Sequence, residues 1–129
     1  MKTRHFTVVP VAIAAFLFLA VVHTVAHAGD NKFFSKEETL AHTTNKTEEW
    51  SKGAGFYSAD GKLLVVWEGE KHEGTWRVKD SGEMCVTLAL WGDEGCHQYE
   101  LKDGSVHLVF DGKGTVRKTE DGNTLESYL

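Results

Sequence analysis

The chain has 129 residues and a formal net charge of −5, with 26% charged and 41% hydrophobic residues. Removal of an expected leader, residues 1–28, leaves 101 residues, which suffice for one domain and exclude a large multi-substrate enzyme or a dinucleotide-binding α/β unit. These 101 residues carry 12 basic and 19 acidic side chains, a net charge of −7, which argues against nucleic acid as a partner and against an anionic-membrane surface.

The N-terminal residues have the pattern of a secretory signal peptide. Lys2 and Arg4 form a short basic start, and residues 8–22 are almost entirely apolar. Ala26-His27-Ala28 then gives the small-x-small pattern that signal peptidase recognises. Cleavage after Ala28 predicts a periplasmic or secreted protein with no stable membrane anchor. The alternative is an uncleaved anchor, because residues 6–28 carry no fixed charge and are long enough to span a bilayer.

Residues 29–52 form a polar N-terminal segment with one helix signal. Ser35-Lys36-Glu37-Glu38 matches a capping box, in which the Ser35 hydroxyl and the Glu38 carboxylate each accept a hydrogen bond from a free backbone amide at a helix start. The segment therefore predicts a short helix over about residues 36–43.

Residues 53–129 have the sequence pattern of a β domain. Asp-Gly pairs occur at 60–61, 103–104, 111–112 and 121–122, and the intervening segments are rich in Val, Leu, Trp and Thr. This pattern predicts an all-β fold: an antiparallel up-and-down meander of about seven strands over residues 54–119. Such a meander curls into a small barrel or a strongly bent sheet.

Turn signals at 60–61, 70–73, 80–82, 103–104 and 111–113 give each hairpin an expected register. The expected facing pairs are Phe56 with Val65, Trp67 with Trp76, Val78 with Met84, Cys85 with Cys96, Tyr99 with Leu108, and Val116 with Leu108. With these registers one face collects the apolar side chains of Phe56, Val65, Trp67, Trp76, Val78, Met84, Val86, Leu88, Tyr99, Leu101, Val106, Leu108, Phe110 and Val116. The outer face keeps an apolar patch of Tyr57, Leu64 and Val66, which we expect the N-terminal segment to cover through Leu40, Phe33 or Trp50.

Cys85 and Cys96 are the two cysteines of the chain. An even count in a small exported domain predicts one disulfide, which should stabilise the fold by about 3 kcal/mol. A redox or metal-binding pair is the alternative, but the ten intervening residues do not fit Cys-x-x-Cys chemistry.

The inner face offers one candidate ligand site. His97 lies there beside Tyr99, and an imidazole on an apolar face needs a partner for each ring nitrogen or an open end of the barrel. With Trp67 and Trp76 it could form a small aromatic pocket with a polar handle, although all four residues also fit ordinary core packing. The histidines do not converge as metal ligands would, so we expect neither a metal nor a cofactor.

The sequence carries no motif of a known catalytic site. The paired acids Glu37/Glu38, Glu48/Glu49 and Asp93/Glu94 lie in polar stretches, whereas general acid–base catalysis requires a carboxylate in an apolar setting. We therefore expect no catalytic residue and no enzymatic activity.

Several short motifs resemble one family of small exported bacterial proteins. The motifs are Gly53-Ala-Gly55-Phe56-Tyr57, Asp60-Gly61-Lys62, Trp67-Glu-Gly69, Gly74-Thr-Trp76-Arg-Val78, the two cysteines and Gly122-Asn123. Over about residues 35–125 the chain resembles domain of unknown function 995. The resemblance implies a secreted or periplasmic protein with a signal peptide, and it carries over no functional residue because the family has no assigned activity.

These observations leave three functional hypotheses. The first is a non-catalytic binding module of the cell envelope that acts through a protein surface, with an envelope or extracellular protein as its partner. The second is a small-ligand carrier that uses the barrel interior near His97 and requires a cavity on the order of 300 Å³ or more. The third is a hydrolase, which would need two titratable groups in one cleft.

Overall fold

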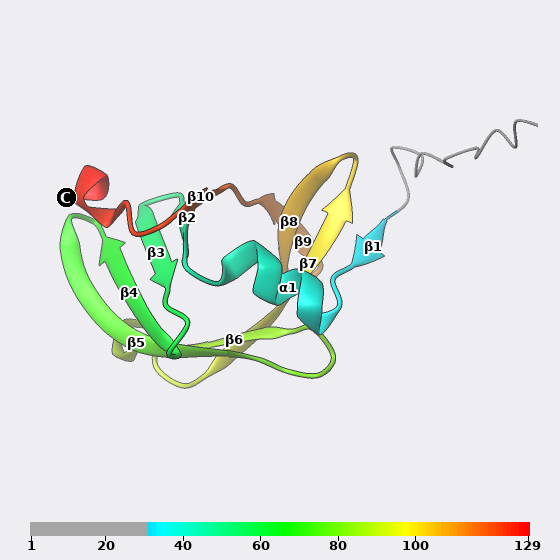
Figure 1. The fold of residues 1–129 in the computed structure, drawn as a ribbon, viewed down its shortest axis with the longest axis horizontal. Helices are drawn as coiled ribbons and strands as arrows, with labels where there is room; N and C mark the ends of the chain where they lie inside the picture. The colour runs from blue at the N-terminus through cyan, green and yellow to red at the C-terminus, as the bar shows by residue number, and fades with distance from the viewer. Residues whose placement is uncertain (1–30) are drawn as a thin grey trace, which may run out of the picture.

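The computed structural model describes residues 31–129, so the expected leader at 1–28 lies outside the described residues. Within residues 31–129, ten strands, one α-helix and two 3-10 helices follow one another (Figure 1). Their bounds are β1 Lys32–Phe33, α1 Lys36–Thr43, β2 Lys46–Trp50, β3 Gly53–Tyr57, β4 Lys62–Trp67, β5 Glu70–Val78, β6 Met84–Thr87, η1 Ala89–Trp91, β7 Gly95–Lys102, β8 Ser105–Phe110, β9 Lys113–Val116, β10 Thr119–Asp121 and η2 Leu125–Tyr128.

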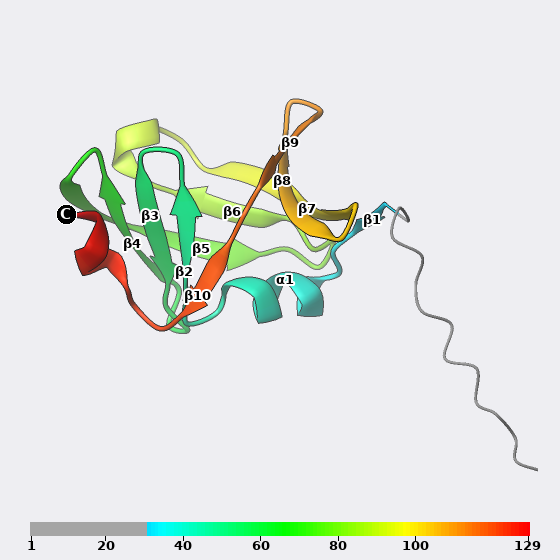
Figure 2. The ribbon, with the colours of Figure 1, turned by 90° about the horizontal axis from the view of Figure 1, so that it is seen from above.

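The strands form one antiparallel sheet curled into a half-barrel, which confirms the all-β prediction. The strand order is β10-β2-β3-β4-β5-β6-β7-β8-β9, with β1 paired to β7. β3 to β9 are the seven strands that the sequence predicts; β1, β2 and β10 are additional. β9 pairs with β8 and β10 pairs with β2, so residues 113–121 cross from one end of the sheet to the other (Figure 2).

The helix α1 lies across one end of the curled sheet (Figures 1 and 2). It begins as predicted: the Ser35 hydroxyl accepts from the Glu38 amide, and the Glu38 carboxylate accepts from the Ser35 amide. Thr39 and Thr43 are buried although they are polar, because the Thr39 hydroxyl donates to the Gly82 carbonyl and the Thr43 hydroxyl to the Thr39 carbonyl. The Thr39 bond fixes α1 against the β5–β6 turn.

The predicted registers of the central hairpins are confirmed. Val78 faces Met84 and Cys85 faces Cys96, as expected from the turn at 80–82 and the disulfide. Tyr99 faces Leu108 across the Asp103-Gly104 turn. Both residues of that turn have positive φ, 51° and 76°, which matches the type I′ turn that Asp-Gly favours.

Three other predicted registers are wrong, and turn geometry explains each. At 60–61 only Gly61 has positive φ, so the loop is one residue longer than predicted and Phe56 faces Leu64 rather than Val65. The β4–β5 hairpin turns at Glu68-Gly69, both with positive φ, and not at 70–73. The predicted pairing of Trp67 with Trp76 is therefore wrong, and Trp67 faces Glu70.

The third wrong register is at the β8–β9 hairpin. Asp111 and Gly112 form a two-residue turn with φ of 48° and 73°, whereas the sequence predicts three residues. Val116 therefore faces His107 rather than Leu108, and it is 47% exposed instead of buried. The same shift turns the next residue, Arg117, towards the interior.

The interior nevertheless collects most of the predicted apolar set. Its buried residues are Tyr57, Leu63, Val65, Trp76, Met84, Leu88, Tyr99 and Leu108. Phe56 is a correction, because the one-residue shift of β3 exchanges it with Tyr57: Phe56 packs on the outer face and Tyr57 in the core. Leu101 and Phe110 are less buried than expected, with 37% and 59% of their surfaces exposed, although Phe110 keeps the predicted face and packs against His97.

The apolar patch on the outer face is covered by the C-terminus. Leu125 and Tyr128 of η2 pack against Ala54, Val66 and Leu64, so the expected cover by the N-terminal segment is wrong. Phe33 is exposed, and Leu40 and Trp50 pack against the interior core instead.

Candidate functional site

A cavity of about 410 Å³ opens at the end of the half-barrel opposite α1. β2, β4 and β8 end there and β7 begins there (Figure 2). Its apolar lining consists of Trp50, Trp67, Val86, Trp91, Leu108 and Phe110. Its polar lining includes Glu48, Ser51, Tyr57, Asp93, His97 and Arg117. A mostly apolar hollow with a few converging polar groups is the usual form of a small-molecule site.

Three tryptophans form one aromatic wall of this cavity. The ring centroids of Trp50 and Trp91 lie 5.4 Å apart, those of Trp67 and Trp91 5.6 Å, and those of Trp50 and Trp67 6.3 Å. At these distances the rings contact one another, so no ligand group fits between them. Trp91 is 47% exposed and Phe110 59%, which places two aromatic rings at the mouth of the cavity.

Glu48 provides a buried charge at the polar side of the cavity. The alternation of β2 turns Glu48 and Trp50 inward and leaves Glu49 exposed. The Glu48 side chain is fully buried, and Oε1 accepts from Trp50 Nε1 at 2.8 Å and from the Tyr57 hydroxyl at 3.4 Å. Oε2 accepts from the Tyr99 hydroxyl. Three donors thus compensate for the loss of water around this carboxylate.

The two tyrosines remain neutral donors. Burial raises the pKa of Tyr99 well above its usual value, and the nearby Glu48 carboxylate raises it further. The pKa of Tyr57 is raised by the same two causes in the same order. Both hydroxyls therefore keep the protons that they donate to Glu48.

Two basic side chains approach the same carboxylate. His42 Nε2, from α1, lies 3.5 Å from Oε2, and the His42 ring packs edge-on against Tyr99. Arg117 Nε lies 3.7 Å from Oε1. Neither nitrogen has a hydrogen-bond partner among residues 31–129, although both are buried.

Arg117 reaches this position because the chain crosses between the two ends of the sheet at that point. Its amide donates to the Val106 carbonyl of β8, and the next carbonyl, of Lys118, accepts from the Glu49 amide of β2. The backbone on both sides of Arg117 is thereby fixed, and its side chain, 19% exposed, lines the cavity.

His97 lies on the cavity wall and packs edge-on against Phe110, with ring centroids 4.8 Å apart. Burial lowers the pKa of His97, and the Arg117 charge lowers it further, while Asp111 and Glu83 act in the opposite direction. His97 is therefore neutral at pH 7.

The structure separates the four residues that the sequence proposes as a ligand site. Trp67 and His97 line the cavity. Tyr99 lies beneath it, bonded to Glu48. Trp76 does not line the cavity: its Nε1 donates to the Ser58 carbonyl at 2.8 Å, and its ring packs against Tyr57.

Sequence reasoning missed Glu48, Arg117, Trp50 and Trp91. The sequence pattern places Glu48 in a polar acid pair, yet Glu48 and Trp50 are two residues apart and share a face in any strand. That spacing was a usable signal. Arg117 could not be placed, because its face depends on whether the turn at 111 has two or three residues.

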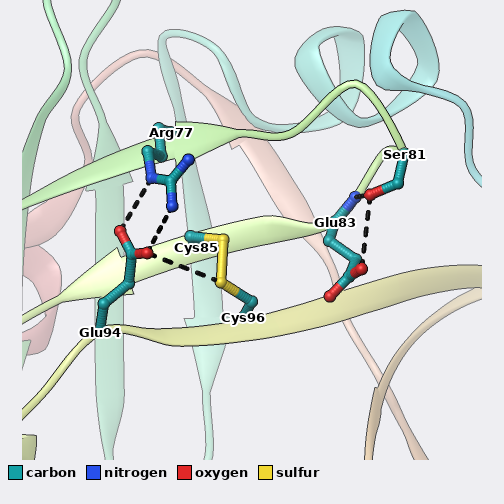
Figure 3. The surroundings of a disulfide bond; sticks show 6 residues. All are labelled: Arg77, Ser81, Glu83, Cys85, Glu94 and Cys96. Carbon is teal, nitrogen blue, oxygen red and sulfur yellow. Dashed lines mark hydrogen bonds and ion pairs between the residues drawn. A yellow bond between two sulfur atoms is a disulfide. The ribbon is translucent and has the colours of Figure 1, made fainter.

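The predicted disulfide between Cys85 and Cys96 is confirmed, and it lies on the outer face of β6 and β7 (Figure 3). Arg77 forms a bidentate ion pair with Glu94 beside it, which lowers the pKa of the Glu94 carboxyl. Cys85, Glu94 and Cys96 are the described residues that lie close enough to hold a metal ion together, but the two sulfurs are bonded to each other.

The fold and the site define a small disulfide-linked β half-barrel with a cavity that opens at one end. The sequence matches the family model described as "Protein of unknown function (DUF995)" over residues 11–123, so the chain belongs to the domain of unknown function 995 family. No curated protein and no solved structure matches the chain.

Proposed function

We propose that this protein is an exported binding protein that holds a small, partly apolar molecule in the half-barrel cavity. The observation that carries the proposal is the cavity itself, about 410 Å³ within a domain of about 100 residues. The cavity opens at one end of the half-barrel, and its wall of aromatic rings with a few polar groups has the usual form of a small-molecule site.

A binding role fits the chemistry of the polar residues better than a catalytic role. A general base needs a free lone pair within reach of the substrate. The Glu48 oxygens already accept three hydrogen bonds, and two basic side chains lie within 4 Å. Each Glu48 oxygen therefore already accepts a hydrogen bond from a protein donor, and neither is left free to accept a substrate proton.

Export is supported by the leader pattern and by the disulfide, because disulfides persist in oxidising compartments. No helix among residues 31–129 is long and apolar enough to cross a membrane. Fractionation of cells that express the full chain, with N-terminal sequencing, tests this part. A periplasmic or secreted product that begins at Gly29 is expected, and a cytoplasmic product that keeps Met1 would contradict export.

Ligand binding is tested with a neutral fluorescent probe, N-phenyl-1-naphthylamine, and a variant that fills the cavity. Gly95 lines the cavity, a Cβ added there would meet no atom closer than 3.5 Å, and its φ is not in the left-handed range, so Gly95→Phe adds a ring at the cavity without backbone strain. Thr87→Phe adds the same ring at an exposed position on the neighbouring strand and serves as the matched control.

The native protein and Thr87→Phe should bind the probe with the same affinity, and Gly95→Phe should bind it about tenfold more weakly or worse. Equal probe binding by all three proteins would contradict a binding site in the cavity.

Binding through a protein surface, the hypothesis that the sequence favours, is the second candidate. Its support is the net charge of −7 on residues 29–129, which suits a basic partner. Pull-down from an envelope extract tests it. One protein enriched by the native chain in a salt-sensitive way is expected, and repeated failure to enrich any protein would contradict it.

A further inference from the structure

We infer that the cavity selects a small amphipathic carboxylate, whose charged end binds the Arg117 guanidinium and whose apolar part lies along the aromatic wall. This inference rests on the proposed function, because it names the class of ligand for the same cavity. The argument begins with the hydrogen bonds that the polar residues of the cavity have and lack.

Arg117 is the group with unused donors. A guanidinium has five N–H donors and cannot lose its charge in a protein. No described residue accepts a hydrogen bond from the Arg117 side chain, its Nε is buried, and its one ion-pair partner in residues 31–129 is Glu48 at 3.7 Å. A cation in this setting is stabilised by an anion that offers two oxygens in one plane, as a carboxylate does.

The hydrogen bonds of the cavity residues disfavour a cationic ligand. Glu48 is the buried anion of the cavity, and its oxygens are occupied by Trp50, Tyr57 and Tyr99. A ligand cation would have to compete with these three donors, and the Arg117 charge, 3.7 Å from Oε1, would repel it. The tryptophan rings contact one another, so they form no open cage for an ammonium group.

The cavity also limits the size of the ligand. A volume of about 410 Å³ corresponds to about fourteen water molecules at liquid density. A ligand of roughly ten to twenty non-hydrogen atoms therefore fills it. Trp91, which belongs to the aromatic wall, and Phe110 both lie at the mouth of the cavity. Most of the ligand therefore contacts aromatic rings, which suits an apolar or aromatic molecule.

The test compares carboxylates with their uncharged isosteres on the native protein. The panel consists of octanoate, decanoate, dodecanoate and naphthalene-1-acetate, each paired with its primary amide, at neutral pH. Binding is followed by intrinsic tryptophan fluorescence, since Trp50, Trp67 and Trp91 line the cavity.

At least one carboxylate should bind about tenfold or more tightly than its amide. Amides that bind as tightly as their carboxylates would overturn this inference and leave the proposed function standing. Failure of the whole panel, together with failure of the neutral probe, would overturn both.

Arg117→Lys assigns the preference to its residue. The lysine keeps a positive charge near Glu48 but loses the planar pair of donors, so the carboxylate preference should fall about tenfold while amide binding is retained. Lys118→Gln, at the adjacent exposed position, removes a full charge and should leave the preference unchanged. An unchanged preference in Arg117→Lys, or an equal loss in Lys118→Gln, would contradict the assignment.

Discussion

At the scale of single residues, the least expected feature is a fully buried glutamate in a domain of about 100 residues. Glu48 is held by side chains from five separate segments: β2, β3, β7, α1 and the β9–β10 connection. These side chains are Trp50, Tyr57, Tyr99, His42 and Arg117. Such a cluster has an energy that depends on every partner being present.

Glu48→Gln should therefore destabilise the protein by about 1–3 kcal/mol, because it removes the anion beside the buried Arg117 Nε and replaces one acceptor oxygen of the cluster with an amide. Glu49→Gln, one residue along on the exposed face, is the matched control and should change stability by less than about 0.5 kcal/mol. Urea unfolding measures both. Similar small changes in the two variants would mean that the cluster does not form in solution.

His97 predicts a pH dependence of stability. Its folded pKa is lowered from 6.5, so the unfolded chain takes up the proton first as the pH falls. The native protein should lose stability below about pH 6.5 relative to His97→Gln, and above that pH the difference between the two proteins should stay constant. The urea midpoints of both proteins between about pH 5 and pH 8 provide the measurement. A native protein that gains stability on acidification relative to the variant would contradict the lowered pKa.

At the scale of elements, turn geometry decides which parts the sequence could predict. The start of α1 and the register of the Asp103-Gly104 hairpin are each determined by residues close together in the sequence, and both predictions are confirmed. Asp60-Gly61 and Asp111-Gly112 have the same two residue types, yet one forms a longer loop and the other a two-residue turn. The difference depends on strand pairing elsewhere, which a local pattern does not contain.

The cover over the outer face could not be predicted for a related reason. Leu125 and Tyr128 are apolar residues in a short polar tail, and their contact with β3 and β4 is distant in sequence. The expectation that the N-terminal segment covers this face came from its apolar residues alone. Phe34, Leu40 and Trp50 of that segment instead pack against the interior.

Leu125→Ala tests the role of η2. Loss of this buried side chain from its contact with Ala54 and Val66 should cost about 2–3 kcal/mol of unfolding free energy. Leu129→Ala, at a position that is 57% exposed, should cost less than about 0.5 kcal/mol. Equal effects of the two substitutions on thermal unfolding would show that the C-terminal tail does not cover the sheet.

At the scale of the whole molecule, the disulfide links two neighbouring strands inside the sheet, away from its edges. It links β6 to β7 at directly facing positions and closes a loop with a sequence separation of 11. A loop of this length should contribute about 3 kcal/mol in the chain-entropy model.

The Cys85→Ala/Cys96→Ala variant should therefore unfold about 3 kcal/mol more readily than the native protein. Dithiothreitol should lower the stability of the native protein towards that of the variant and leave the variant unaffected. Native stability that is the same with and without the reductant would contradict a structural role for the bond.

The whole-molecule fold was predictable to the level of an all-β meander because hydrophobic alternation is redundant across many strands. The candidate site was predictable only in part. Trp67 and His97 followed from alternation within a strand, whereas the facing of Glu48 with Arg117 depends on β2 and β10 joining the sheet. The pairing of β2 with β10 forms only when the whole chain folds, and no single segment predicts it.

The central claim is that a small ligand binds in the cavity of the half-barrel, between the aromatic wall and Arg117. NMR spectra of the side-chain N–H groups during titration with naphthalene-1-acetate test it most directly. The Arg117 Nε–H and the indole N–H signals of Trp67 and Trp91 should shift together and saturate at one affinity. The Trp76 indole, which donates to the Ser58 carbonyl outside the cavity, should stay in place. Shifts confined to Trp76, or no shift of Arg117 and the cavity tryptophans at saturating ligand, would contradict the account.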